Sequence, residues 1–333
     1  MILTIIKLTA GLICILVGAN YLVDSSVAIA KRFNIPDMVI GMTLVALGTS
    51  APEIVVSFVG AAGGSSDIAI GNVIGSNICN ILLVLGLATL IFPLTITSEN
   101  KKVEIPCVLG ATLLVLILSK SFFNGFSVEL GRLSGFILLL AGVAFLIYSY
   151  IITIREQSRN EQDINTDKTQ EQAIPKLFRK IYNKRILVPI ASGVFIISCL
   201  LLVWGGNSFV EGAKELARRI GMSEMTIAAT IVAVGTSLPE LATSVAAAFK
   251  KNSGIALGNI VGSNVLNICI ALGGSALIHP LKTTIQTSHL LFFALSAALL
   301  FIFAIVSRIK FHRIYGLLFV SLYIAYIISI AAH

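Results

Sequence analysis

Residues 48–53 read Gly-Thr-Ser-Ala-Pro-Glu and residues 235–240 read Gly-Thr-Ser-Leu-Pro-Glu, so the same polar interruption occurs twice inside long apolar runs. A proline within a helix has no amide hydrogen, so the carbonyl four residues earlier loses its partner. Glutamate is expensive to place in lipid, which makes Glu53 and Glu240 candidates for a functional site. The pattern predicts two matching sites in a membrane, each with a carboxylate, hydroxyls and a free carbonyl.

A second motif, Gly-Asn-x-x-Gly-Ser-Asn, follows each glutamate at residues 71–77 and 258–264. The polar residues expected on one helix face are Ser76 and Asn80 in the first copy, and Ser263 and Asn267 in the second. We expect these faces to meet the glutamates near the middle of the bilayer. Such a set of oxygen atoms, without imidazole or thiolate, suits a hard cation such as Ca²⁺ or Na⁺. Two carboxylates balance one Ca²⁺ or two Na⁺, and competition for that charge is a physical basis for exchange.

Each of these polar groups also has a structural interpretation. The prolines at 52 and 239 are compatible with ordinary helix kinks, and the glycines at 71 and 258 with close helix packing. Four asparagines can cap broken helices or bond across an interface instead of binding a cation: Asn72, Asn77, Asn259 and Asn264. Four serines can bond to their own helix backbone: Ser50, Ser57, Ser237 and Ser244. For the glutamates the alternative is a buried hydrogen bond, which the lack of a basic residue in the same runs disfavours.

The composition places the chain in a membrane. Of the 333 residues, 56% are hydrophobic and only 12% are charged, which is more apolar surface than one soluble core can bury. A helix crosses the hydrocarbon with about 20 apolar residues, whereas a barrel needs alternating strands that are not seen here. We therefore expect an all-α membrane protein with ten transmembrane helices, near residues 3–23, 38–60, 68–92, 103–119, 131–152, 186–210, 224–248, 254–278, 288–306 and 313–331.

The basic residues and the cysteines indicate no further function. The formal charge of +8 lies mostly between the apolar runs, where anionic lipid and membrane orientation account for it, so no nucleic-acid partner is expected. The five cysteines lie within apolar runs without a CxxC pair, and we interpret them as packing residues.

The chain is a duplication. A shift of 187 residues aligns residues 41–94 with residues 228–281 without a gap, and about half of these positions are identical. Because five predicted helices precede the second copy, the two copies cross the membrane in opposite senses, as in the inverted repeats of secondary transporters. We expect a first five-helix repeat at 1–152, a polar cytoplasmic linker at 153–185 and a second five-helix repeat at 186–333. The Lys and Arg residues of the linker then place both termini outside.

The paired motifs resemble the two alpha-repeats of the calcium/cation antiporter superfamily, and the layout is similar to that of its compact prokaryotic sodium/calcium exchangers. The resemblance covers nearly the whole chain. It implies Na⁺/Ca²⁺ exchange by alternating access in a prokaryotic cytoplasmic (inner) membrane, extruding calcium, with the first and sixth helices sliding against the rest. It also implies ions and lipid as partners, without a cofactor, an obligate protein partner or enzymatic activity. The family's ion ligands fall on the carbonyls of Ala46 and Ala233 and on the side chains of Thr49, Ser50, Glu53, Ser76, Asn80, Thr236, Ser237, Glu240, Ser263 and Asn267.

Asn267 departs from the family pattern, because many relatives have aspartate at this position. In potassium-dependent branches that acid is linked to potassium use, so asparagine favours potassium-independent exchange. A buried glutamate can also take up a proton in place of Na⁺, which leaves an antiporter of Ca²⁺ or another divalent cation against protons as the alternative. An intramembrane protease and a purely structural scaffold are disfavoured, because no lysine in a predicted span faces a serine and two buried acids without a ligand are unfavourable.

Overall fold

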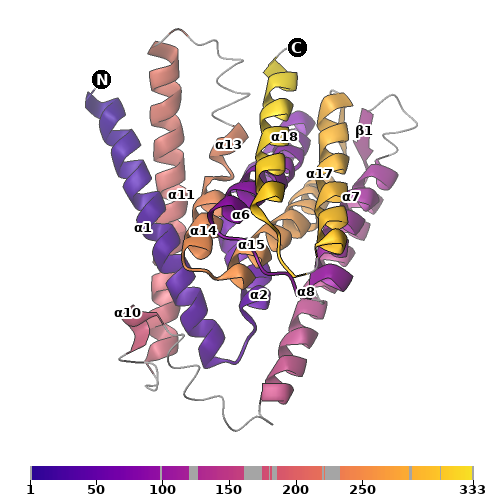
Figure 1. The fold of residues 1–333 in the computed structure, drawn as a ribbon. Helices are drawn as coiled ribbons and strands as arrows, with labels where there is room; N and C mark the ends of the chain where they lie inside the picture. The colour runs from indigo at the N-terminus through magenta and orange to yellow at the C-terminus, as the bar shows by residue number, and fades with distance from the viewer. Residues whose placement is uncertain are drawn as a thin grey trace.

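The computed structural model describes residues 2–97, 100–119, 127–160, 175–179, 181, 186–219, 221, 233–284, 287–307 and 309–331. Most of the helices run roughly along one direction, and the two termini lie at the same end of the molecule (Figure 1). We call this end the terminal face, and the opposite end the linker face.

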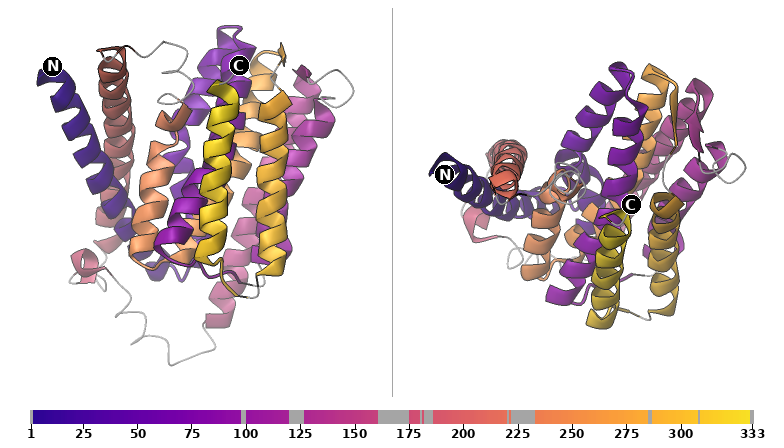
Figure 2. Two further views of the ribbon diagram at one scale, coloured as in Figure 1. Left: turned by 45° about the horizontal axis from the view of Figure 1, so that its top comes forward. Right: turned by 90° about the horizontal axis from the view of Figure 1, so that it is seen from above.

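Two long helices, α1 (Ile2–Arg32) and α11 (Leu187–Arg219), form a pair at one side of the molecule (Figures 1 and 2). They run in opposite directions and touch along their length. Glycines allow this close approach: a Cβ atom on Gly11 would lie 2.7 Å from the backbone nitrogen of Phe209, and one on Gly205 would lie 2.9 Å from the carbonyl oxygen of Gly11. The two helices therefore pack as one unit.

Two helices at the centre of the rest of the molecule change midway from α-helix to π-helix and back. The first consists of α5 (Ser66–Ile78), a π-helical segment (Cys79–Leu85) and α6 (Gly86–Ile91). The second consists of α15 (Ser253–Leu266), a π-helical segment (Asn267–Leu272) and α16 (Gly273–Ile278). Short π-helical segments occur frequently at functional sites, and these two begin at or next to the asparagines predicted as ligands.

A broken helix precedes each central helix. The first consists of α2 (Asp37–Ile40), a π-helical segment (Gly41–Val45) and α3 (Ala46–Thr49), and continues after a bend of 49° as α4 (Ala51–Ala62). The described part of the second consists of α13 (Ala233–Gly235) and α14 (Leu238–Phe249). Pro52 and Pro239 stand in the first turn of α4 and α14, where a missing amide hydrogen is tolerated. Each motif therefore ends one helix and starts the next.

The other described elements surround this centre. They are α7 (Ile105–Leu118), α8 (Arg132–Asn160), α10 (Lys176–Arg179), α17 (Thr287–Val306), α18 (Arg313–Ala331) and a π-helical segment (Asn100–Glu104). Two short strands, β1 (Ser127–Leu130) and β2 (Leu281–Thr284), pair antiparallel. These strands were not predicted from the sequence, because each has only four residues and its partner lies far away in the chain.

The helices confirm an all-α membrane protein, but their number does not reach ten. Seven described helices are long and apolar enough to cross a membrane, and the bent helix from α2 to α4 is an eighth if it counts as one span. The run predicted at 103–119 forms α7, which has only 14 residues. The run predicted at 224–248 falls partly outside the described residues, as does most of the linker predicted at 153–185. Ten spans therefore stay a prediction.

Helix α15 packs directly against the backbone of the first broken helix. A Cβ atom on Gly262 would lie 2.3 Å from the carbonyl oxygen of Met42 and 2.7 Å from the Cβ atom of Ala46. We expect Gly262→Ala to lower the free energy of unfolding by about 1–3 kcal/mol, because the two backbones must separate. Thermal unfolding in detergent measures the effect. Gly110→Ala is the matched control, since an added Cβ there meets nothing described within 4 Å; equal melting temperatures for both variants would contradict the close packing.

Candidate ion-binding site

The helix breaks place the two glutamates at equivalent positions. Ser50 (φ −82°, ψ 3°) and Ser237 (φ −86°, ψ 8°) leave the helical conformation immediately before α4 and α14. Glu53 and Glu240 follow in the first turn of these helices. The amino-terminal end of a helix carries partial positive charge, so it stabilises the ionised form of a carboxylate at this position.

Both carboxylates are fully buried, at 0% exposure. Among the described residues, neither oxygen of Glu53 has a hydrogen-bond partner, and the same is true of Oε2 of Glu240. The two carboxyl groups lie near enough to interact electrostatically. Two unpaired buried carboxylates are strongly unfavourable unless a positive charge joins them.

Three hydrogen bonds connect the predicted ligands of one copy with the other copy. The hydroxyl of Ser50 donates to Oε1 of Glu240 at 2.9 Å. The hydroxyl of Thr49 donates to Oδ1 of Asn259 at 3.0 Å. The amide of Asn267 donates to the hydroxyl of Ser76 at 3.4 Å. The two motif copies, 187 residues apart in sequence, therefore meet at one place as predicted, while the role of these residues as ligands stays a prediction.

Further predicted ligands present free oxygen atoms inside the protein. The side chains of Asn80, Ser237, Ser263 and Asn267 are fully buried, and each has at least one oxygen without a hydrogen-bond partner among the described residues. Buried polar atoms normally have partners, so a concentration of unpaired oxygens is typical of a site that receives an ion or water. Besides the two carboxyl groups, the unpaired oxygens gathered here belong to hydroxyl and amide side chains.

The remaining predicted ligands lie at the ends of the broken helices. The carbonyl of Ala46 accepts the amide of Ser50 at 2.9 Å, and a carbonyl has a second lone pair available. Ala233 is the first residue of α13. Thr236 is only partly buried and lines a cavity described below. Its counterpart Thr49 is fully buried, so the two threonines differ in accessibility.

The four motif asparagines divide into two pairs by the acceptor that each side-chain amide uses. Asn77 and Asn264 donate to carbonyls of their own helices, at 2.7 Å in each case, so they neither cap a helix nor cross an interface through this group. The amides of Asn72 and Asn259 instead cross to the preceding broken helix and donate to the hydroxyls of Ser57 and Ser244. The interface interpretation is therefore confirmed for these two asparagines, and the serines bind them.

Two residues beside the site, Cys79 and Tyr323, were not predicted from the sequence. The thiol of Cys79 is buried beside the hydroxyls of Tyr323 and Ser237 and is influenced by the charges of Glu53 and Glu240. All five cysteines were predicted to be packing residues. Cys79, however, directly precedes the predicted ligand Asn80, and this position was the available signal. Tyr323 comes from α18, outside both motifs, and no signal in the sequence could have assigned it.

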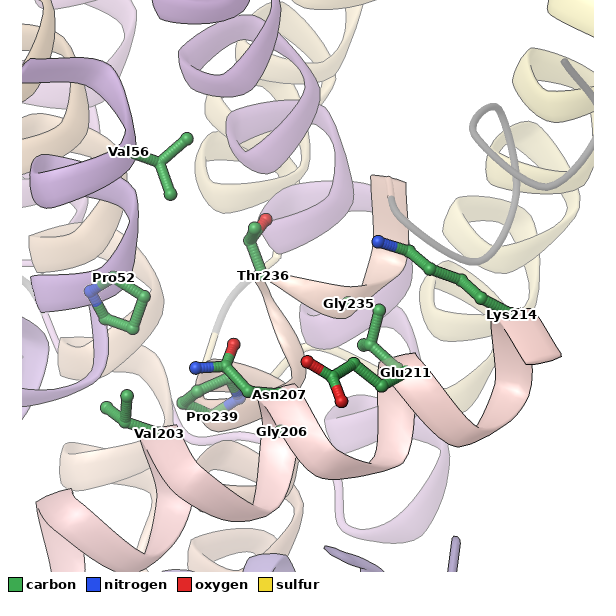
Figure 3. A pocket seen from close by; sticks show the side chains of 11 residues that line it. Pro52, Val56, Val203, Gly206, Asn207, Glu211, Lys214, Gly235, Thr236 and Pro239 are labelled. Atoms are coloured by element: carbon green, nitrogen blue, oxygen red, sulfur yellow. The ribbon is translucent and has the colours of Figure 1, made fainter. Parts of the chain in front are cut away.

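A cavity of about 250 Å³ borders Thr236 and lies along the later half of α11, the half nearer the terminal face (Figures 1 and 3). It lies between α11 and the helix breaks, and Asn207 and Glu211 project from α11 into the space bounded by Pro52, Thr236 and Pro239. Glu211 also pairs with Lys7 of α1 at 3.0 Å, near the N-terminal end of that helix. At the linker face, Lys250 instead joins the end of α14 to Asp24 of α1 at 2.7 Å.

Comparisons with known proteins agree with this geometry. The family model described as "Sodium/calcium exchanger protein" matches residues 3–151 and 190–331. The chain is 31% identical to the sodium/calcium exchanger MaX1 of Methanosarcina acetivorans, covering 96% of both chains. It is 35% identical to the inner membrane protein YrbG of Escherichia coli, covering 84% of this chain and 81% of that one.

A solved structure has the same fold. The sodium-calcium exchanger NCX_Mj, in crystals soaked with Na⁺ and Sr²⁺, superposes with a TM-score of 0.78 at 32% identity, covering 99% of this chain and 98% of that chain. With the family model matching most of its length, the chain belongs to the sodium/calcium exchanger family.

Proposed function

We propose that the protein exchanges Na⁺ for Ca²⁺ across the membrane and that Glu53 and Glu240 hold the transported ions. The observation that carries the proposal is the pair of fully buried carboxylates, three of whose four oxygens have no hydrogen-bond partner among the described residues. Bound cations would neutralise the two carboxylates and pair with their free oxygens. We therefore propose a transporter and not an enzyme.

The surrounding atoms favour hard cations. Ca²⁺ takes six to eight oxygen ligands at about 2.3–2.6 Å, from carboxylates, carbonyls, amides and hydroxyls. We propose the following ligand set: the carbonyls of Ala46 and Ala233 and the side chains of Thr49, Ser50, Glu53, Ser76, Asn80, Thr236, Ser237, Glu240, Ser263 and Asn267. One Ca²⁺ or two Na⁺ neutralise the two carboxylates, so the two kinds of ion compete for the site.

We further propose ten spans in two inverted repeats, at 1–152 and 186–333, joined by a cytoplasmic linker at 153–185. The opposite directions of α1 and α11, which are equivalent helices of the two copies, support this arrangement (Figure 1). Both termini lie at one end of the molecule, which agrees with an even number of spans, and we place this end outside. The inner-membrane relative YrbG supports a location in a prokaryotic cytoplasmic membrane.

The Na⁺ gradient then drives calcium out of the cell. If more than two Na⁺ enter for each Ca²⁺, a cycle moves net charge, and the membrane potential adds about 2.3 kcal/mol per charge per 100 mV. A positive-inside diffusion potential across proteoliposomes would reveal such a charge movement as a change in the exchange rate.

Proteoliposomes test the coupling ion. With Na⁺ inside and none outside, we expect rapid calcium uptake, because outward Na⁺ movement releases the site for inward Ca²⁺. An imposed pH gradient without Na⁺ is the matched comparison, and we expect no uptake there. Uptake driven by the pH gradient alone would establish the alternative, a Ca²⁺ or other divalent cation/proton antiporter that uses the same carboxylates.

A further inference from the structure

Asn259 connects three functional segments from inside the protein. Its side chain is fully buried. Its amide donates to the hydroxyl of Ser244 at 3.0 Å and makes a longer contact, 3.5 Å, with the carbonyl of Glu240. Its oxygen accepts the hydroxyl proton of Thr49 at 3.0 Å. Asn259 therefore joins α15 both to the second broken helix and to the end of the first.

The hydrogen bond from Thr49 to Asn259 determines which part of the Thr49 hydroxyl can bind an ion. A threonine hydroxyl has one proton and two lone pairs. The proton of Thr49 points to Asn259, with the carbonyl of Ala46 as a more distant acceptor at 3.4 Å. The lone pairs are then the part of the hydroxyl left for a cation, so Asn259 keeps Thr49 in the accepting orientation.

The first copy contains the same network with one bond fewer. A shift of 187 residues relates Asn259 to Asn72, Ser244 to Ser57, and Thr49 to Thr236. The amide of Asn72 donates to the hydroxyl of Ser57 and to the carbonyl of Glu53, both at 3.0 Å. Across the described residues, however, no hydrogen bond joins Thr236 to Asn72, and Thr236 lines the cavity on the terminal face.

The difference between the two threonines matches the position of the cavity. Thr236 lines the cavity and has no hydrogen bond to Asn72 among the described residues. Thr49, in the other copy, donates a hydrogen bond to Asn259. In an inverted repeat, the state open to the opposite face exchanges the environments of the two copies. We propose that Asn259 and Asn72 are positioning residues that hold Thr49 and Thr236 in alternation. The Thr49–Asn259 bond belongs to the state open at the terminal face, and the Thr236–Asn72 bond belongs to the state open at the linker face.

The inference rests on the inverted repeats of the proposed function, but its first test does not need transport. Val56 lines the cavity and is partly exposed (Figure 3). In a background without the five native cysteines, V56C supplies a single thiol, and the rate of its reaction with a membrane-impermeant maleimide reports how often the terminal face is open.

Opposite shifts are the expected result. N259A removes a bond of the state open at the terminal face, so labelling should slow by about five-fold, the size of one hydrogen bond. N72A removes a bond of the other state and should increase labelling or leave it at its maximum. The double variant should return toward the starting rate, because the two biases cancel. Equal slowing in both single variants, or no change in N259A, would overturn the proposal.

A second measurement separates positioning from general damage. Right-side-out and inside-out vesicles give the KM for Ca²⁺ at each face, and the affinity for a ligand falls with the fraction of protein in the competent state. We expect the ratio of KM at the terminal face to KM at the linker face to rise in N259A and to fall in N72A. A damaged site would raise both KM values together. If the wild type carries no calcium with sodium, the proposed function fails while the labelling test still decides this inference.

Discussion

Replacing either buried glutamate by glutamine is expected to abolish sodium-driven calcium uptake. E53Q and E240Q keep the shape of the side chain but remove one of the two charges that a Ca²⁺ ion requires. Removing one partner of a buried charge interaction typically costs about 3–5 kcal/mol, which corresponds to a loss of affinity of about 100-fold or more. Initial rates of radioactive calcium uptake into proteoliposomes measure the effect.

The same variants are expected to fold. Without a cation, both oxygens of Glu53 and Oε2 of Glu240 are buried and lack a partner among the described residues, so a neutral amide there is no more expensive than the carboxylate. Their melting temperatures without cations should therefore equal or exceed that of the wild type. E129Q is the matched control, because Glu129 is accessible and pairs with Lys282 on the β1–β2 sheet. Wild-type uptake in E53Q or E240Q would refute the site.

Local chemistry explains why much of the site could be predicted from the sequence. Pro52 and Pro239 favour the start of a helix. A glutamate in the first turn after each break is unfavourable inside a membrane unless it binds a cation or another partner. The duplication supplies a further constraint, since two equivalent motifs in one chain are expected to meet at a pseudo-symmetric centre. The bond between Ser50 and Glu240 agrees with that expectation.

Contacts between distant segments could not be predicted in this way. Tyr323 reaches Cys79 from α18, and β1 pairs with β2 across almost half of the chain. The unequal surroundings of Thr49 and Thr236 could not be predicted by comparing the two copies either, because each threonine lies between a glycine and a serine. The difference between them depends on the three-dimensional surroundings of each threonine.

Calcium is expected to stabilise the protein strongly against unfolding. In the ion-free site, three of the four carboxyl oxygens of Glu53 and Glu240 are buried without a hydrogen-bond partner among the described residues, and a bound cation supplies that partner. A ligand that binds only the folded state adds about 2.7 kcal/mol at 100 times its Kd and about 4.1 kcal/mol at 1,000 times. Thermal unfolding in detergent, followed by circular dichroism with a chelator or with calcium, should show a rise of several degrees.

Three comparisons make this stabilisation specific to the site. Added Na⁺ should reduce the shift that calcium causes, because the two ions compete for the same carboxylates. Mg²⁺ is the matched divalent control and should cause little shift, since it requires a small octahedral site and gives up water reluctantly. E240Q should lose the calcium shift while E129Q keeps it. A calcium shift of wild-type size in E240Q, or an equal shift with Mg²⁺, would mean that calcium acts on surface charges and not between Glu53 and Glu240.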